Sequence, residues 1–311
     1  INFYVWLIWW VLVIFQEAII IKIRHKYCIL EDFKDLDKKE NIKLRKLNHL
    51  SEIHHAYDTF VIDLWGVMHD GITLNQKAIE AIDQLKKNSK KIVFLSNAPR
   101  PSAKVVDFLK SLKMDKKYLS NVITSGEAAM HAINKNKFGK TFYHLGPPRD
   151  FSVFEKVKDN KTSIENCDFI LCTGLFDEHE EDLDFYKKFL EKHISKKLVC
   201  TNPDLIVHRG VKEEYCAGYI AKIFENLGGE TIYYGKPHKA IYEMCFTDSE
   251  KVLAIGDNLR TDIKGANNLN KDCLLISDGV HRSEFSNDNE LKKLLKKYDV
   301  KVNYYQKELE W

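Results

Sequence analysis

The chain has 311 residues, of which 44% are hydrophobic and 30% are charged. This length supports a large core and favours about two domains. The 48 basic and 45 acidic side chains leave a formal charge of only +3, and the Lys and Arg residues are scattered along the chain. Proteins that bind nucleic acid usually gather these residues into a basic patch, so the composition argues against a nucleic-acid partner.

The cysteines are dispersed, with no CxxC pair and no histidine spacing that is typical of zinc sites. An odd, dispersed set is typical of reduced thiols, so we expect free cysteines and a cytoplasmic location rather than disulfides. The seven are Cys28, Cys167, Cys172, Cys200, Cys216, Cys245 and Cys273.

The N-terminus carries an unusual apolar segment. Residues 3–15 (FYVWLIWWVLVIF) are uninterrupted apolar sequence, and Gln16 and Glu17 then interrupt it before a basic stretch. A membrane-spanning helix needs about 20 apolar residues, and Glu17 would be costly inside it. Three interpretations stay open: a membrane anchor, an extension that is not a natural start, and a packed amphipathic helix. We expect no secretory signal peptide, and membrane contact only if residues 1–23 form an anchor.

Strands and helices alternate from about Ser51 onward, after a charged stretch at 27–50 that we interpret as a linker or a solvated helix. FVID ends at Asp63, and apolar residues then recur at helical spacing from Leu74 to Leu85. This strand-then-helix unit is repeated, with further expected strands at KIVFLSN, NVITSG, TIYYG, KVLAIGD and CLLIS. The alternation predicts an α/β fold with a Rossmann-like, doubly wound parallel sheet. The last three helices are expected to begin near His238, Arg260 and Ser283.

A second α/β stretch interrupts this pattern, and we interpret it as an inserted α/β cap domain. Its expected strands are KTFYHLG, CDFILCTG and KKLVCTN, and its expected helices span 181–193 and 213–227. The predicted division is an N-terminal extension at 1–48, core segments at 49–130 and 230–311, and the cap at 131–229.

Polar residues follow the predicted core strands. Ligands in open parallel sheets bind beyond the carboxyl ends of the strands, so these side chains are expected to share one site. If the three aspartates converge, their negative charges match Mg²⁺ plus one lysine, and a few hard oxygen ligands suit magnesium better than zinc. The residues are Asp63, Ser96, Asn97, Lys236, Asp257 and Asp262.

The reaction that suits such a site is attack of a carboxylate on phosphorus, which gives an aspartyl-phosphate that water later cleaves. Lys236 and the Ser96 hydroxyl would bind phosphoryl oxygens while Mg²⁺ orients the nucleophile. Gly66 would let the loop backbone come close to the phosphoryl group. Each residue alone also has a structural interpretation as a turn or cap residue. The ordered set favours a site.

The motifs DLWGV, LSN, GKP and GDNLRTD, in this order, resemble the four signature motifs of the haloacid dehalogenase superfamily of phosphohydrolases. The chain is similar to the NagD-like class IIA branch, and within it to a subset with DLWGV in the first motif. In that branch an α/β cap lies between the second and third motifs. The resemblance covers about residues 50–300.

The resemblance implies a role for each matching residue. Asp63 would be the nucleophile and a metal ligand, and the backbone carbonyl of Trp65 and the Asp257 carboxylate would be further ligands of Mg²⁺. Asp262 would support the metal through water or from behind its ligands. Ser96 would bind the phosphoryl group and Lys236 would stabilise its charge.

One position departs from the family's pattern. Most phosphatases of this superfamily have an aspartate two residues after the nucleophile, which protonates the leaving oxygen, and here Trp65 takes its place. An indole N–H does no acid–base work near neutral pH, and losing such a group lowers rates on the order of 10²- to 10⁴-fold. His69 and Asp70 are alternative proton donors, and the indole is expected to shape the pocket or the contact with the cap.

The cap contributes further candidates for substrate binding. Asn202, Asp204 and Arg209 lie in TNPDLIVHRG, which we expect to be a loop that faces the core, and Asn97 and Gly66 complete the predicted substrate site. The alternative is ordinary turn chemistry.

The leading hypothesis is a Mg²⁺-dependent phosphohydrolase of small phosphorylated metabolites. The first alternative is a protein that binds such a metabolite with little or no hydrolysis, because Trp65 replaces the acid. The second is phosphoryl transfer to an acceptor other than water, or cleavage of a different bond. The class IIA resemblance also suggests a homodimer formed through the cap.

Overall fold

The computed structural model describes residues 44–311, so the expectations for the apolar segment and for most of the 27–50 linker lie outside the described residues. Within 44–311, no helix combines the length and apolarity needed to cross a membrane. The end of the predicted linker is neither linker nor solvated helix. Leu47 and Leu50 are buried in the main core, because burial of these apolar side chains outweighs the charged composition around them.

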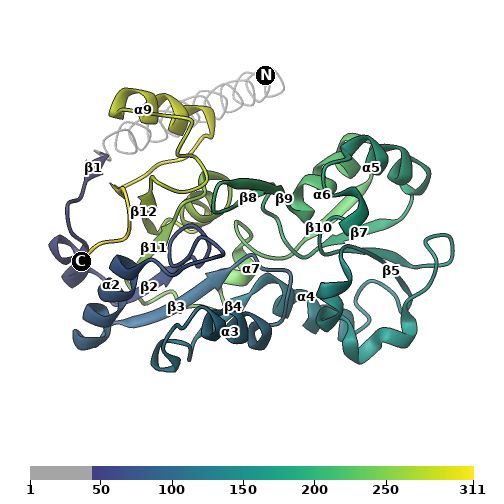
Figure 1. The fold of residues 1–311 in the computed structure, drawn as a ribbon, viewed down its shortest axis with the longest axis horizontal. Coiled ribbons are helices and arrows are strands. Elements are labelled where there is room, and N and C mark those ends of the chain that lie inside the picture. The colour runs from purple at the N-terminus through teal and green to yellow at the C-terminus, as the bar shows by residue number, and fades with distance from the viewer. Residues whose placement is uncertain (1–43) are drawn as a thin grey trace, which may run out of the picture. The chain divides into compact units, whose positions relative to one another are not determined.

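The main sheet contains seven parallel strands in the order β1-β13-β12-β11-β2-β3-β4 (Figure 1). β2 and β11 lie near the centre of this sheet, and every residue of both strands is buried. A parallel strand covered on both faces needs near-continuous apolar sequence, which TFVI and VLAIG supply. The strands are β1 (Arg45–Lys46), β2 (Thr59–Ile62), β3 (Lys91–Ser96), β4 (Val122–Thr124), β11 (Val252–Gly256), β12 (Asp272–Ile276) and β13 (Tyr304–Gln306).

Helices cover both faces of this sheet, so the predicted doubly wound α/β class is confirmed. α2 (Gln76–Lys87) and α3 (Ser102–Ser111) pack on one face. α7 (Lys239–Tyr242), α8 (Lys264–Asn268) and α9 (Asp288–Lys297) pack on the other.

The start of α9 differs from the prediction. The helix begins at Asp288 rather than near Ser283, because the side chain of Asn287 accepts the N–H groups of Asn289 and Glu290 and so caps the helix there.

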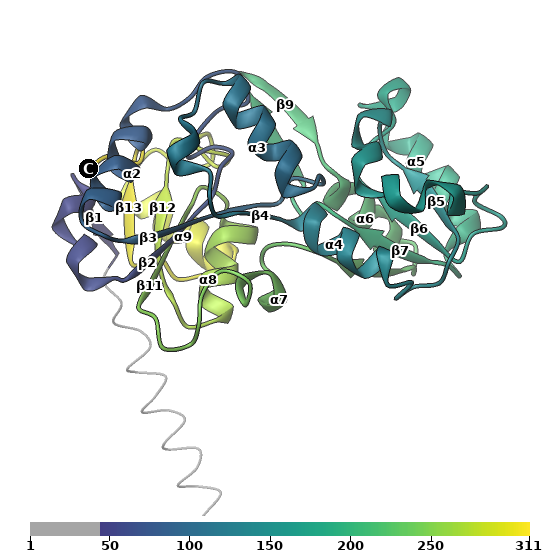
Figure 2. The ribbon, with the colours of Figure 1, turned by 90° about the horizontal axis from the view of Figure 1, so that it is seen from below.

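A second parallel sheet of four strands lies beside the first, in the order β10-β7-β6-β5 (Figure 2). α5 (Leu183–Leu190) and α6 (Ala217–Asn226) cover one face, and α4 (Ser125–Asn134) covers the other. We call residues 125–233, from α4 to β10, the second lobe. Its sheet strands are β5 (Phe142–Leu145), β6 (Phe169–Cys172), β7 (Lys197–Cys200) and β10 (Glu230–Tyr233).

Short helical turns connect these elements. They are the 3-10 turns η1 (Leu50–Glu52), η2 (His54–Ala56), η3 (Lys116–Tyr118), η4 (Pro148–Val153), η5 (Glu155–Asn160), η6 (Asp177–His179) and η7 (Glu191–His193), and the π-helical turn η8 (Leu259–Ile263).

The structure corrects two strand assignments. The sequence predicts TIYYG in the main sheet, but β10 pairs with β7 of the second lobe, because an apolar strand pattern does not specify which sheet the strand joins. TNPDLIVHRG, expected to be a loop, contains β8 (Ile206–Arg209), which forms an antiparallel hairpin with β9 (Lys212–Tyr215). Gly210 permits the tight turn because its φ is +60°. The helix expected at 213–227 consequently begins only at Ala217.

A buried imidazole makes the stability of the second lobe depend on pH. His144 of β5 is 6% exposed, its Nε2 lies 2.9 Å from Thr173 Oγ1, and its ring packs against Phe154. Burial, and to a smaller extent the charge of Lys161, lower the pKa of His144 to about 4. The unfolded chain takes up this proton near an ordinary pKa of about 6.5, whereas the folded protein resists it.

We predict that the stabilisation due to neutral His144 is complete above about pH 6.5 and is lost as the pH falls toward 4. Between pH 6.5 and pH 4 the unfolding free energy of the wild type should fall further than that of His144→Gln. The difference between the two falls should be on the order of 2 kcal/mol. Urea denaturation at several pH values measures the difference. His55→Gln, which changes an exposed histidine, is the control. Identical pH dependence in wild type and His144→Gln would contradict the prediction.

Candidate active site

The carboxyl ends of the central strands place polar side chains at one edge of the main sheet. Asp63 directly follows β2, and its backbone N–H donates to the carbonyl of Ile255 in β11 at 2.8 Å, which extends the ladder by one residue. Ser96 ends β3, and Asp257 directly follows β11. The strands are parallel neighbours. Side chains that are far apart in the sequence therefore meet at this edge.

Lys236 joins two of the carboxylates. Its Nζ lies 2.6 Å from Asp63 Oδ1 and 2.7 Å from Asp262 Oδ1, and the residue is 2% exposed. Asn97 fixes the lysine backbone, because its Oδ1 accepts the Lys236 N–H at 2.8 Å and its Nδ2 donates to the Lys236 carbonyl at 3.3 Å. The amide that we predicted to bind substrate is therefore occupied in positioning Lys236.

The three carboxylates lie close enough to share a cation. One oxygen from each of Asp63, Asp257 and Asp262 can be chosen so that all three lie within 4.8 Å of one another. Asp262 is fully engaged, because its Oδ1 binds Lys236 and its Oδ2 accepts the Asn258 N–H at 3.3 Å. Asp257 Oδ2 accepts the Val280 N–H at 2.7 Å. Among residues 44–311, Asp63 Oδ2 and Asp257 Oδ1 accept no hydrogen bond and remain available to a metal ion.

Burial and mutual repulsion raise the pKa values of two carboxyl groups in the cluster. Burial, and then repulsion from Asp262, raise the pKa of Asp63 well above its usual range and that of Asp257 to about 7. Burial alone would lower the pKa of Lys236, but Asp262 and Asp63 outweigh it and raise that pKa well above its usual range. Three carboxylates facing one ammonium group fit a divalent cation, which would supply the missing charge.

The loop after Asp63 offers donors to an anion. The backbone N–H groups of Leu64 and Trp65 have no acceptor among the described residues. The Ser96 Oγ accepts the Ala98 N–H at 3.2 Å, which leaves its hydroxyl proton without an acceptor in the same part of the chain. Gly66 has a φ of +83°, and a Cβ there would lie 2.2 Å from Asp257 Oδ2. A side chain at this position would displace Asp257.

Trp65 connects the loop to the second lobe. Its Nε1–H donates to the carbonyl of His208 in β8 at 2.7 Å, and the Arg209 guanidinium carbon lies 5.1 Å from the centroid of the indole ring. Gly71, with a φ of +87°, leaves room for the ring, because a Cβ there would lie 2.6 Å from Trp65 Cζ2. The indole therefore forms one of the contacts with the second lobe.

The two alternative proton donors of the loop have structural partners. His69 is buried, and its Nδ1 accepts the Gly71 N–H at 3.0 Å. Burial lowers the pKa of His69 to about 4, although the charge of Asp70 acts in the opposite direction. Asp70 is exposed, and its Oδ1 accepts the backbone N–H groups of Thr73 and Ile72, which lower the pKa of Asp70 against the opposing effect of desolvation.

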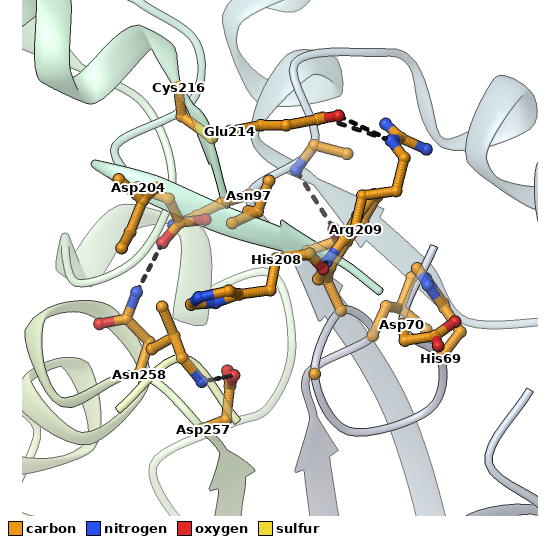
Figure 3. Close-up of a pocket in the computed structure, with 18 of the residues that line it drawn as sticks. His69, Asp70, Asn97, Asp204, His208, Arg209, Glu214, Cys216, Asp257 and Asn258 are labelled. Atoms are coloured by element: carbon orange, nitrogen blue, oxygen red, sulfur yellow. Dashed lines mark hydrogen bonds and ion pairs between the residues drawn. The ribbon is translucent and has the colours of Figure 1, made fainter. Parts of the chain in front are cut away.

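One cavity of about 780 Å³ contains the core site and the second-lobe candidates. Its wall includes Asp63, Ser96, Asn97, Asp257, Asn202, Asp204 and Arg209. Lys236 and Asp262 do not line the cavity. They lie behind its wall, where Lys236 bonds to Asp63 and Asp262 accepts the N–H of Asn258. Figure 3 shows His208 and Asp204 on the side of this cavity that faces Asn258 and Asp257.

The predicted second-lobe residues make specific contacts within that wall. The carboxylate of Asp204 accepts the Asn258 Nδ2–H at 3.2 Å, and Asn202 Oδ1 accepts the Asp204 N–H at 3.1 Å. Burial raises the pKa of Asp204. Arg209 Nε donates to both oxygens of Glu214, at 3.1 and 3.3 Å. These contacts place the three candidates beside the core site, although only Asp204 bonds directly to a core side chain.

Sequence reasoning missed two features of the site. The hairpin residues His208 and Glu214 line the cavity, and alternation across IVHR and KEEY was the available signal. His281 Nε2 accepts the Leu259 N–H at 3.1 Å, and its Nδ1 lies 2.5 Å from Glu284 Oε1. This imidazole fixes the start of η8 behind Asp257, and no motif pointed to it.

The comparisons with known proteins agree with this arrangement. Residues 60–158 match the family model of haloacid dehalogenase-like hydrolases, and residues 233–297 match a second model described as HAD-hydrolase-like. Together the two matches contain all four motifs. The chain therefore belongs to the haloacid dehalogenase-like hydrolases, a family of enzymes.

Relatives of known sequence and structure cover most of the chain. The 5'-nucleotidase YutF of Bacillus subtilis is 26% identical over 248 residues, which are 75% of this chain and 92% of that protein. A haloacid dehalogenase-like hydrolase from Brucella suis has a TM-score of 0.74 and 28% identity, over 85% of this chain and 99% of that one. A 4-nitrophenylphosphatase from Thermotoga maritima has a TM-score of 0.61 and 25% identity, over 82% and 96%.

The contact between Gly66 and Asp257 gives a test of the loop geometry. We predict that Gly66→Ala lowers the unfolding free energy by about 1 kcal/mol for its positive φ and by about 1–3 kcal/mol more for the clash. Gly228→Ala is the matched control, because Gly228 has a φ of +93° and a Cβ there would meet nothing within 4 Å. Urea denaturation compares the two variants, and equal destabilisation would refute the packing of Gly66 against Asp257.

Proposed function

We propose that this chain is a Mg²⁺-dependent phosphatase of small phosphorylated metabolites that forms an aspartyl-phosphate on Asp63. The observation that carries the proposal is the bridge of Lys236 between Asp63 and Asp262, with Asp257 beside them at the end of the central strands. The names of the relatives, a 5'-nucleotidase and a 4-nitrophenylphosphatase, support phosphoryl compounds as substrates.

Mg²⁺ would be held by the free oxygens of Asp63 and Asp257 and by the backbone carbonyl of Trp65, which accepts no hydrogen bond from the described residues. Asp262 would support the site by holding Lys236 and the Asn258 backbone. When bound, the ion neutralises the carboxylates and polarises phosphoryl oxygens. This arrangement of few oxygen ligands suits magnesium.

The residues of the chain carry out the displacement itself. The Asp63 carboxylate attacks phosphorus, an O–P bond forms, and the bond to the leaving oxygen breaks. The N–H groups of Leu64 and Trp65 and the Ser96 hydroxyl would hold the phosphoryl oxygens, and Lys236 orients Asp63 from behind. Water then attacks the aspartyl-phosphate, which releases phosphate and restores the carboxylate.

The second lobe is proposed to act as the cap of the class IIA branch, within about the limits 131–229 that the sequence predicts. Its hairpin reaches the nucleophile loop, and its wall residues complete the cavity. Closure of such a lobe would exclude bulk water from the intermediate. Six cysteines of the described residues are free, which supports a reducing, cytoplasmic compartment.

Trp65 favours a second candidate function. Because an indole stands where the family's acid stands, the chain is alternatively a protein that binds a phosphorylated metabolite and hydrolyses it negligibly. Tight binding without turnover of any phosphate ester would distinguish this candidate.

We predict that Asp63→Asn lowers Mg²⁺-dependent hydrolysis of 4-nitrophenyl phosphate more than about 10³-fold, because the amide is no nucleophile. Phosphate release measures the activity, and urea denaturation should show a folded variant. The matched control is Asp278→Asn, a half-exposed acid on the cavity wall, which should keep wild-type activity. Full activity in Asp63→Asn would refute the assigned nucleophile.

A further inference from the structure

Trp65 serves as a fixed contact and not as a proton donor. The single N–H of its indole donates to the carbonyl of His208 at 2.7 Å, and an indole does not ionise near neutral pH. The bond ties the β8–β9 hairpin to the loop that carries Asp63. A second bond, from the Gly210 N–H to the Asp70 carbonyl at 3.1 Å, reinforces this contact.

The neighbouring side chains of the loop are committed to its own structure. The imidazole of His69 accepts the Gly71 N–H and packs edge-on against Phe108, 5.5 Å between ring centroids. The carboxylate of Asp70 accepts the N–H groups of Ile72 and Thr73 at 2.9 and 2.7 Å. Turning either group toward a leaving oxygen would break these hydrogen bonds.

A permanent positive charge lies beside the indole. The Arg209 guanidinium is 5.1 Å from the centroid of the Trp65 ring, lines the same cavity as Asp63, and bonds through Nε to Glu214. Within residues 44–311 its terminal nitrogens have no hydrogen-bond acceptor. Arginine does not release a proton at neutral pH, so it can stabilise a departing oxyanion by charge but cannot protonate it.

We propose that the substrate is a phosphoryl compound whose leaving group departs as a weakly basic oxyanion, an acyl phosphate or a phosphoanhydride, rather than an alkyl phosphate. The inference rests on the proposed function and names the substrate class of the same site. A leaving carboxylate or phosphate needs charge stabilisation, which Arg209 offers, whereas a leaving alkoxide needs the proton that this loop does not supply.

The proposed reaction balances without an acid. The Asp63 oxygen forms a bond to phosphorus, the bond from phosphorus to the leaving oxygen breaks, and the electron pair leaves with that oxygen as an anion. In the second step water attacks, the Asp63–phosphorus bond breaks, and the proton of the water passes to the released phosphate. The aspartyl-phosphate is itself an acyl phosphate, so both steps expel a weakly basic oxyanion.

A leaving-group series tests the proposal. The kcat/KM of the wild type with Mg²⁺ is measured for acetyl phosphate, inorganic pyrophosphate, 4-nitrophenyl phosphate, phenyl phosphate and glycerol phosphate. We expect the kcat/KM for glycerol phosphate to be at least about 10²-fold lower than that for phenyl phosphate, because a general acid raises rates by about 10²- to 10⁴-fold. The acetyl phosphate and pyrophosphate arms separate the acyl and anhydride classes, and preference for either supports the inference.

Two substitutions of Trp65 separate chemistry from structure. Trp65→Asp restores a carboxyl group and should reduce the ratio of phenyl to glycerol phosphate turnover at least about tenfold. Trp65→Phe removes the bond to His208 without adding an acid and should leave this ratio unchanged even if overall activity falls. The ratio is insensitive to a general loss of folding, which affects both substrates equally.

Comparable kcat/KM for phenyl and glycerol phosphate in the wild type would overturn the inference. If His208→Gln then abolished only the glycerol phosphate activity, the acid would be His208, and the inference would again be wrong. Failure of the proposed function has a different signature: no substrate in the series is hydrolysed, or Asp63→Asn remains as active as the wild type.

Discussion

A buried ammonium group holds the site together. Lys236 Nζ contacts both Asp63 and Asp262, and all three residues are nearly inaccessible to solvent. Taking charges out of water is costly unless they are paired, so this bridge largely determines where the carboxylates of Asp63 and Asp262 can lie. The bridge also explains why both polar atoms of the Asn97 amide form hydrogen bonds with the Lys236 backbone. Without this positioning, the lysine could not satisfy two acids at once.

The same bridge connects the second lobe to the polar site at the edge of the main sheet. The chain leaves the second sheet at Tyr233 and reaches Lys236 three residues later. The other crossing, between β4 and α4, lies beside Ser96 through the pairing of Ser96 with Thr124. Both connections therefore run along the edge of the site. Movement of the second lobe would therefore be transmitted to Lys236 and Ser96.

The core site was predictable because each of its residues ends or follows a buried apolar strand. Asp63 after TFVI and Asp257 after VLAIG are visible in the sequence, and parallel strands bring such ends together. The partner of Trp65 was not predictable, because His208 lies 143 positions away and the contact is made by its backbone carbonyl.

The placement of β10 was not predictable for a related reason. Its apolar pattern suits either sheet, and only its pairing with β7 assigns it to the second lobe. His281 left no trace in a motif, because it acts by accepting the backbone N–H of Leu259. Local pattern therefore identified the polar residues that meet at the ends of the central strands, while long-range backbone contacts determined what surrounds them.

The central claim is that the three carboxylates around Lys236 form one site for a divalent ion. Isothermal titration calorimetry with Mg²⁺ on the wild type and on Asp257→Asn tests this claim most directly. The account predicts one Mg²⁺ per chain for the wild type and at least about a tenfold weaker affinity in Asp257→Asn, which removes one charged ligand. Equal Mg²⁺ affinity in the two proteins, or no binding by the wild type, would contradict it.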